Sequence, residues 1–167
     1  IVRTYATRVG EGPFPTEMVD VEEDMANLIR QRGNEYGSVT KRPRRCGWFD
    51  AVATRYAAEL NGFDSIALTK LDVLDALDQI QVCTGYEIDG KRVDTFPAVS
   101  HDLRQIKPVY ETLEGWKTNT VGTTDFDKLP ELAQKYVRFL SEQIGVEIGL
   151  ISTGPERDQT IILKQSV

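Results

Sequence analysis

Apolar residues recur along this chain with two different spacings, which predicts strands that alternate with helices. Helical spacing is found in three segments: Asp20–Arg32, Trp48–Leu60 and Leu129–Ile144. Short apolar runs typical of buried strands occupy Val2–Val9, Asp64–Thr69, Val109–Leu113, Glu147–Ser152 and Thr160–Leu163. This alternation predicts an α/β fold whose strands form part of a mostly parallel sheet.

Local signals mark where several of these elements begin and end. Asp20 and Glu23 form a capping box at the first helix, and Gly33 and Gly145 are expected to stop the helices that precede them. Pro130 is expected in the first turn of the last helix. A short helix is expected over Val73–Leu77, whereas the stretches 34–47 and 114–127 read as irregular.

An Asp-Gly pair, Asp89-Gly90, separates two strand-like runs, Gln81–Ile88 and Lys91–Phe96. Asp-Gly between such runs is a strong signal for a tight β-hairpin. The sequence therefore predicts an antiparallel hairpin over residues 81–96, as an excursion from the sheet.

Composition favours one globular domain over residues 1–167, because 40% of the 167 residues are hydrophobic and 28% are charged. No apolar run approaches the roughly 20 residues that span a bilayer, so we expect no membrane partner. Cys46 and Cys83 are too few and too far apart for a disulfide framework, which fits a reducing, cytoplasmic location. The start at Ile1, without Met, suggests a fragment or a processed product.

The segment Thr69-Lys70-Leu71-Asp72 ends a buried strand and suits recognition of a guanine base. The carboxylate of Asp72 can accept hydrogen bonds from the ring N1–H and the exocyclic amine, while the methylene stem of Lys70 lies along the ring. Alternatively, Asp72 simply caps the helix that follows. Ligands of open α/β sheets bind beyond the carboxyl ends of strands, which supports the first interpretation but leaves both open.

A second strand end carries Ser152-Thr153-Gly154-Pro155, which can present backbone N–H groups and hydroxyls to a base. An ordinary turn is the alternative. The same two alternatives apply to the glycine-proline run from Gly10 to Pro15.

Positive charge is concentrated in residues 38–45, although the net charge of the chain is −6. This loop contains Ser38, Val39, Thr40, Lys41, Arg42, Pro43, Arg44 and Arg45. Arginine side chains bind carboxylates and phosphates through two parallel hydrogen bonds, so the loop is a candidate for holding anionic groups. A solvated surface run or an RNA-contacting patch is the alternative, although the net negative charge argues against general nucleic-acid binding.

Other chemical signals are weak. His101, the sole histidine, lies in a polar segment typical of an exposed loop. We find no phosphate-cradling glycine loop, no metal-ligand cluster and no nucleophile–base pair, so no catalytic residue is assigned to this chain.

Five segments together resemble the C-terminal part of adenylosuccinate synthetases, in the order of that family. They are Arg8–Glu17, Gly33–Gly37, Arg42–Asp50, Leu68–Asp75 and Ile151–Pro155. The resemblance implies a GTP- and Mg²⁺-dependent ligase that joins IMP to L-aspartate, giving adenylosuccinate, GDP and phosphate on the route to AMP. It also implies a homodimeric parent enzyme.

The resemblance also implies roles for individual residues. Arg44, Lys70, Leu71, Asp72, Ser152, Thr153 and Gly154 would bind GTP. Val9 and Arg42 would contact IMP, and Ser38 to Arg44 would clamp L-aspartate, with Thr40 and Arg42 reaching its carboxylates. Lys41 stands where the family usually has glycine, which puts the free closure of this loop in doubt.

The family's N-terminal half, with its phosphate loop, catalytic aspartate and histidine and Mg²⁺ ligands, has no counterpart in these residues. The chain alone is therefore expected to lack activity. A non-catalytic guanine-nucleotide binding module is the alternative function.

Overall fold

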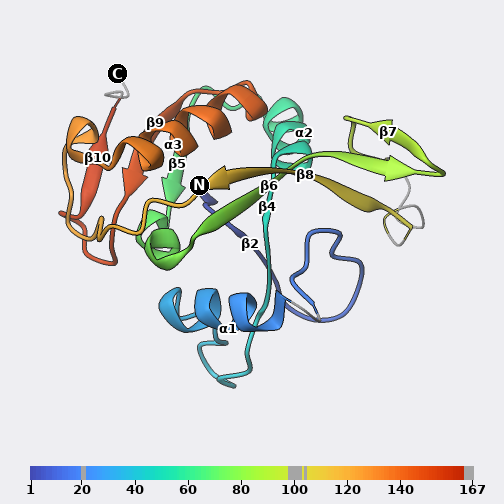
Figure 1. The fold of residues 1–167 in the computed structure, drawn as a ribbon, viewed down its shortest axis with the longest axis horizontal. Coiled ribbons are helices and arrows are strands. Elements are labelled where there is room, and N and C mark those ends of the chain that lie inside the picture. The colour runs from blue at the N-terminus through green and yellow to red at the C-terminus, as the bar shows by residue number, and fades with distance from the viewer. Residues whose placement is uncertain (20–21, 98–102, 104, 164–167) are drawn as a thin grey trace.

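The structure is a computed structural model that describes residues 1–19, 22–97, 103 and 105–163. Within these residues one sheet has the strand order β1–β5–β9–β10. Its strands are β1 (Val2–Arg3), β5 (Ile66–Thr69), β9 (Ile148–Ser152) and β10 (Thr160–Ile162). The first three run parallel, and β10 is antiparallel to β9. The carboxyl ends of β5 and β9 therefore lie at the same edge of the sheet (Figure 1).

A second sheet is mostly antiparallel. It contains β4 (Phe49–Asp50), β6 (Gln79–Ile88), β7 (Lys91–Val93) and β8 (Lys107–Glu114). The hairpin predicted around Asp89-Gly90 is confirmed, since β6 pairs with β7 and both turn residues have positive φ, 50° and 73°. β8 pairs along the other edge of β6, so the molecule is a mixed α/β fold with parallel and antiparallel strands.

Two predicted helices pack against each other beside these sheets (Figure 1). α2 spans Ala51–Asn61, and α3 spans Glu131–Ile144 with a buried stripe that includes Tyr136 and Leu140. α2 begins three residues later than predicted from Trp48, because Phe49 and Asp50 pair with β6 and Asp50 Oδ1 accepts the N–H of Ala53 at 2.9 Å. Pro130 lies just before α3 rather than in its first turn, and Gly145 (φ 76°) ends the helix as predicted.

The prediction of one strand over Val2–Val9 is wrong. Residues 4 and 5 bend the chain, so that β1 joins the first sheet while β2 (Ala6–Arg8) pairs antiparallel with β3 (Arg45–Gly47). The end of the predicted irregular stretch 34–47 is therefore a strand. The bend buries the Tyr5 side chain and directs its hydroxyl towards Glu35.

α1 (Glu23–Arg32) lies within the predicted helix but begins later, with Glu22 at the N-cap position and no side-chain cap bond; the predicted cap Asp20 lies outside the described residues. Gly33 ends α1 with φ −78°, so a left-handed turn is not what requires glycine here. A Cβ at this position would lie 2.2 Å from the Tyr5 hydroxyl oxygen, and that close approach explains the glycine.

Short 3₁₀ helices within the described residues include η2 (Leu71–Ala76) and η4 (Phe126–Lys128). η2 replaces the short helix predicted over Val73–Leu77, and only Lys70 separates it from β5. Among the described residues, no helix combines the length and apolar character needed to cross a membrane.

Candidate functional site

A cavity of about 800 Å³ lies beyond the carboxyl ends of β5 and β9. Four residues predicted from the sequence as base ligands line it: Lys70, Asp72, Ser152 and Gly154. Residues far apart in the sequence thus meet at one sheet edge, where ligands of open α/β sheets usually bind. We call this cavity the base pocket, after the base ligands expected from the sequence.

Lys70 sits at the first position after β5 with a left-handed backbone, φ 69°. Its carbonyl oxygen accepts the Thr4 hydroxyl at 2.8 Å, and its Nζ donates to the carbonyl oxygen of Gly33 at 2.9 Å. The side chain is therefore extended across the base pocket, with its charged end held by the turn that follows α1.

Asp72 lies in the first turn of η2, whereas Lys70 occupies the cap position, so the capping alternative for Asp72 is wrong. The Asp72 Oδ1 atom is buried and has no hydrogen-bond partner among the described residues. Burial raises the pKa of the carboxyl and Asp75 adds to that increase, while a hydrogen bond from the Asp72 backbone N–H and the charges of Lys70 and Arg32 act in the opposite direction. A buried acceptor without a partner is costly, and a ligand with N–H donors would relieve that cost.

The turn after β9 is held by its own side chains. Ser152 Oγ donates to the carbonyl oxygen of Gly154 at 2.8 Å. Thr153 is fully buried, and its Oγ1 donates to the carbonyl oxygen of Thr123 at 2.9 Å. Ser152 and Gly154 line the base pocket, whereas the Thr153 side chain anchors the turn. Leu71, another predicted base ligand, has its side chain in the hydrophobic core.

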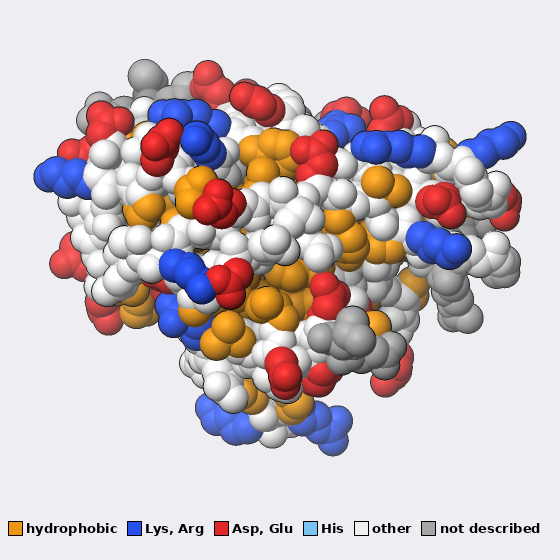
Figure 2. All heavy atoms as spheres, viewed as in Figure 1, with side chains coloured by type: hydrophobic (Ala, Val, Ile, Leu, Met, Phe, Trp, Pro, Cys, Tyr) orange, Lys and Arg blue, Asp and Glu red, His pale blue; other side chains and the backbone are white. Residues whose placement is uncertain are grey.

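The residues between α1 and β3 form a narrow two-stranded loop. The backbone N–H of Arg44 donates to the carbonyl oxygen of Glu35, and that of Gly37 to Arg42, each at 2.9 Å. Residues 38–43 at its tip are exposed, and Lys41 has a left-handed backbone, φ 55°. Figure 2 shows Lys and Arg side chains at the bottom of the view, where Figure 1 places this loop. We call residues 38–45 the arginine loop.

The four cations of the arginine loop have different environments. Arg45 pairs with Glu17 and also donates to the carbonyl oxygens of Gly10 and Gly12 at 3.0 and 2.9 Å. It thereby connects β3 to the glycine-proline run, while Val9 beside that run is 78% exposed. Lys41 and Arg42 are exposed and form no ion pair within the described residues, so both are available to an anionic ligand.

Arg44 is bound to a buried carboxylate that the sequence analysis missed. Its Nη1 donates to Glu35 Oε2 at 2.7 Å, the Tyr5 hydroxyl donates to Oε1 at 2.7 Å, and Arg3 Nε lies 3.4 Å from Oε1. Burial alone would raise the pKa of Glu35, but the hydrogen bonds from Tyr5 and Arg44 and the charges of the two arginines hold it below its ordinary value. Glu35 is therefore ionised.

A family model described as adenylosuccinate synthetase matches residues 1–161. This chain belongs to the adenylosuccinate synthetase family. The adenylosuccinate synthetase of Aquifex aeolicus (strain VF5) is 51% identical over 165 residues, which is 99% of this chain. That of Synechococcus sp. (strain RCC307) is 50% identical over 167 residues, 100% of this chain. The chain spans 38% of the length of each of these relatives.

The fold agrees with that of a solved member of the family. The structure described as fully ligated adenylosuccinate synthetase from Plasmodium falciparum superposes with a TM-score of 0.91 at 39% identity, covering 98% of this chain and 39% of that one. The sequence-based resemblance to adenylosuccinate synthetases and the α/β fold class are thus both confirmed.

The base pocket also contains residues that the sequence did not single out as ligands. Arg3, Arg32 and Asn34 line it, and Arg32 Nη2 donates to the carbonyl oxygen of Asp72 at 2.8 Å. Arg32 and Asn34 flank the helix stop Gly33, but nothing in the local pattern shows that this turn packs against the end of β5. Only the long-range contact brings them to the pocket.

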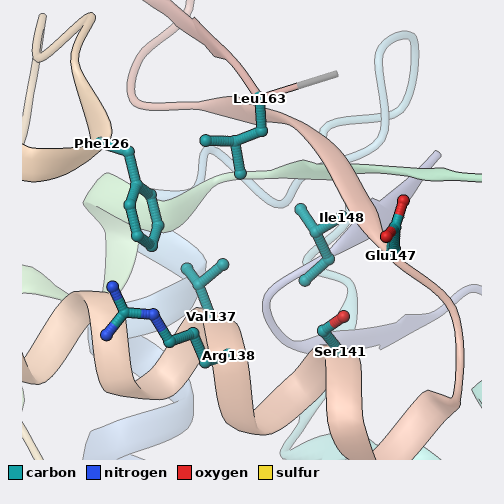
Figure 3. A pocket seen from close by; sticks show the side chains of 7 residues that line it. All are labelled: Phe126, Val137, Arg138, Ser141, Glu147, Ile148 and Leu163. Carbon is teal, nitrogen blue, oxygen red and sulfur yellow. The ribbon is translucent and has the colours of Figure 1, made fainter.

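Another hollow, of about 550 Å³, lies between α3 and β9 (Figure 3). Phe126, Val137, Ile148 and Leu163 line it, and the Arg138 guanidinium lies 5.3 Å from the centre of the Phe126 ring. None of the predicted site residues reaches it. His101 lies outside the described residues, and those residues contain no cluster of His, Cys, Asp and Glu able to hold a metal ion.

Proposed function

We propose that this chain is the substrate-binding C-terminal part of a GTP-dependent ligase that joins IMP to L-aspartate. The products are adenylosuccinate, GDP and phosphate. Family membership supports this activity. The observation that carries the assignment of the base pocket is the buried Asp72 Oδ1, which lacks a partner among the described residues and lies in a cavity shared with Lys70 and Ser152.

In this proposal Asp72 accepts hydrogen bonds from the guanine N1–H and its exocyclic amine. The Lys70 stem covers one face of the ring, and Ser152, Thr153 and Gly154 close the pocket, with Thr153 acting through the turn it anchors. Adenine lacks the N1–H, so it would leave the carboxylate unpaired. Sites built around such polar contacts discriminate by roughly 10⁴-fold or more.

The arginine loop would serve the other two substrates. Arg42 and Thr40 would bind the carboxylates of L-aspartate, because both are exposed at the tip of the loop and Arg42 has no ion-pair partner within the described chain. Arg42 and the exposed Val9 would contact the ribose region of IMP, and Arg44 would serve both L-aspartate and GTP. Concentrated arginine in an otherwise acidic chain suits substrates that are all anionic.

In the family reaction the IMP 6-oxygen is phosphorylated by GTP, and the aspartate amine then displaces that phosphate. We assign no acid or base for this chemistry to the described residues. They also do not fit Mg²⁺, since no group of carboxylates is assembled. These groups are expected in the segment of the family that this chain does not match. We further propose that the parent enzyme is homodimeric and cytoplasmic, and the two buried free cysteines fit a reducing compartment.

A chimera tests the proposed function. Residues 1–167 replace the matching 38% of the Aquifex aeolicus relative, and adenylosuccinate formation is assayed with that relative as the positive control. We expect activity that requires GTP, IMP and L-aspartate together. A folded but inactive chimera would argue against the proposal, and guanine-nucleotide affinity without response to IMP or aspartate would favour the non-catalytic module.

A further inference from the structure

We propose that Glu35 is a positioning residue that holds Arg44 and Arg3 in place and so links the arginine loop to the base pocket. This inference rests on the proposed function. Glu35 itself is not accessible to a ligand, because its side chain is only 1% exposed. Its two carboxylate oxygens are directed to different partners, Oε2 to Arg44 and Oε1 to Tyr5 and Arg3.

The first arm of this arrangement is Arg44. Its backbone is fixed on both sides, because its N–H donates to the carbonyl oxygen of Glu35 and its carbonyl oxygen accepts Arg30 Nε at 3.0 Å. The Arg44 side chain is 27% exposed, and its guanidinium makes one hydrogen bond within the described residues, through Nη1 to Glu35. The buried Nε has no partner there. Glu35 thus fixes one edge of a planar fork and leaves its other donors for a ligand.

The second arm is Arg3, which lines the base pocket and reaches Glu35 Oε1 at 3.4 Å. Lys70 also connects the segment around Glu35 to the base pocket. Its Nζ donates to the carbonyl oxygen of Gly33, two residues before Glu35. One buried anion therefore contacts cations that belong to two binding sites. Removal of the Glu35 charge would therefore free both Arg44 and Arg3 to move.

The direction in which substrate affinity changes when Glu35 is replaced distinguishes a positioning role from a purely electrostatic one. Removing a negative charge near anionic substrates should tighten their binding if Glu35 acts only through its field. Removing the group that aims Arg44 should weaken their binding, because an unheld arginine loses side-chain entropy when it binds the ligand. We expect weaker binding.

The test compares Glu35→Gln with Tyr5→Phe in the chimera described above. Both variants remove a buried hydrogen bond at the same carboxylate, but only Glu35→Gln removes the charge that holds Arg44. Tyr5→Phe should lower Tm and leave each KM within about twofold. Glu35→Gln should raise KM for both GTP and L-aspartate by about tenfold or more, as expected for loss of a hydrogen bond between charged groups, with a smaller change in kcat.

A second variant covers the case in which Glu35→Gln fails to fold. Glu35→Asp keeps the charge but shortens the reach to Arg44, so both KM values should rise to an intermediate level. Unchanged KM values in Glu35→Asp, or tighter binding in Glu35→Gln, would overturn the positioning role. An inactive unmutated chimera would instead count against the proposed function itself.

Discussion

The Nζ of Lys70 donates a hydrogen bond of 2.9 Å to the carbonyl oxygen of Gly33, joining the end of β5 to the end of α1. These two residues are far apart in the sequence, and the bond places the turn after α1 against the base pocket. Arg32, the last residue of α1, strengthens the same junction by donating to the carbonyl oxygens of Asp72 and Val73 at 2.8 and 3.0 Å. The backbone around Asp72 is thereby fixed, while its carboxylate is left for a ligand.

Asp72→Asn should weaken the use of GTP and relax the choice of base. The amide offers one acceptor and one donor group where guanine presents two donors, so a hydrogen bond to a charged acceptor is lost. At about 1.5–3 kcal/mol for such a bond, KM for GTP should rise by roughly 10- to 100-fold. Xanthosine triphosphate carries an oxygen in place of the exocyclic amine and should become the better substrate of the variant. Steady-state kinetics of the chimera with both nucleotides measures this.

Asp75→Asn is the matched control for that variant. Asp75 is buried three residues further on and accepts Trp116 Nε1 at 2.6 Å and both the N–H and the hydroxyl of Thr120 at 2.8 Å. Its substitution should lower Tm without changing nucleotide preference. If Asp72→Asn leaves the preference for guanine intact, the assignment of the base pocket is wrong.

The pH dependence of stability should differ in sign for the carboxylates of Asp72 and Glu35. The pKa of Asp72 is raised in the folded chain, so its charged form destabilises the fold above that pKa, and this cost disappears as pH falls through it. The pKa of Glu35 is lowered, so its contribution to stability is present above the ordinary value of 4.5 and is lost as pH falls through the folded-state pKa.

Thermal unfolding of the chain and its variants at a series of pH values tests both signs. Asp72→Asn should be more stable than the unmutated chain at pH 7, with the difference vanishing in acid. Glu35→Gln should be less stable at pH 7, and this difference should also shrink in acid. The same sign for both variants at pH 7 would contradict this account.

Elements set by local chemistry were predictable from the sequence, and elements set by distant partners were not. Asp89-Gly90 defines its hairpin because both residues adopt positive φ readily. The break between β1 and β2 depends on burial of Tyr5 and on pairing with residues 45–47, about forty positions away. The pattern of apolar residues in the stretch 2–9 gives no information about this pairing with residues 45–47.

The candidate site shows the same division. Lys70 and Asp72 were found because a polar pair directly follows an apolar strand. Glu35 was missed because its three side-chain partners, Tyr5, Arg44 and Arg3, are all non-local, and a lone glutamate after a helix normally reads as a solvated residue. The structure therefore adds the support beneath the arginine loop, which the sequence did not show.

Lys41, whose φ is 55°, should be replaceable by glycine with little loss of stability. Left-handed backbone costs an ordinary residue about 1–2 kcal/mol, and glycine avoids this cost while adding freedom to the unfolded chain. Thermal unfolding should rank the variants Gly, then Asn, then Val, in order of falling Tm. All three variants remove the same charge. An equal shift in Tm for all three would therefore show that the charge of Lys41, and not its backbone conformation, determines the effect on stability.

Gly33→Ala should destabilise the chain because the added Cβ would lie 2.2 Å from the Tyr5 hydroxyl oxygen and 2.9 Å from the Ile29 carbonyl oxygen. Tyr5 is 3% exposed and cannot swing into solvent, so its bond to Glu35 must break or the turn must shift. Overpacking of this kind costs about 1–3 kcal/mol. Denaturant unfolding measures the loss.

A double-mutant cycle with Tyr5→Phe assigns that loss to the hydroxyl. Phenylalanine removes the nearest clashing atom, so Gly33→Ala should cost less in the Tyr5→Phe background, by a coupling of about 0.5–3 kcal/mol. Gly90→Ala supplies the control: its Cβ would meet nothing within 4 Å, and its cost comes from φ 73° alone. That cost should be the same with or without the Tyr5 hydroxyl. Strict additivity for Gly33→Ala as well would mean that contact with Ile29, and not with the Tyr5–Glu35 pair, requires glycine at the end of α1.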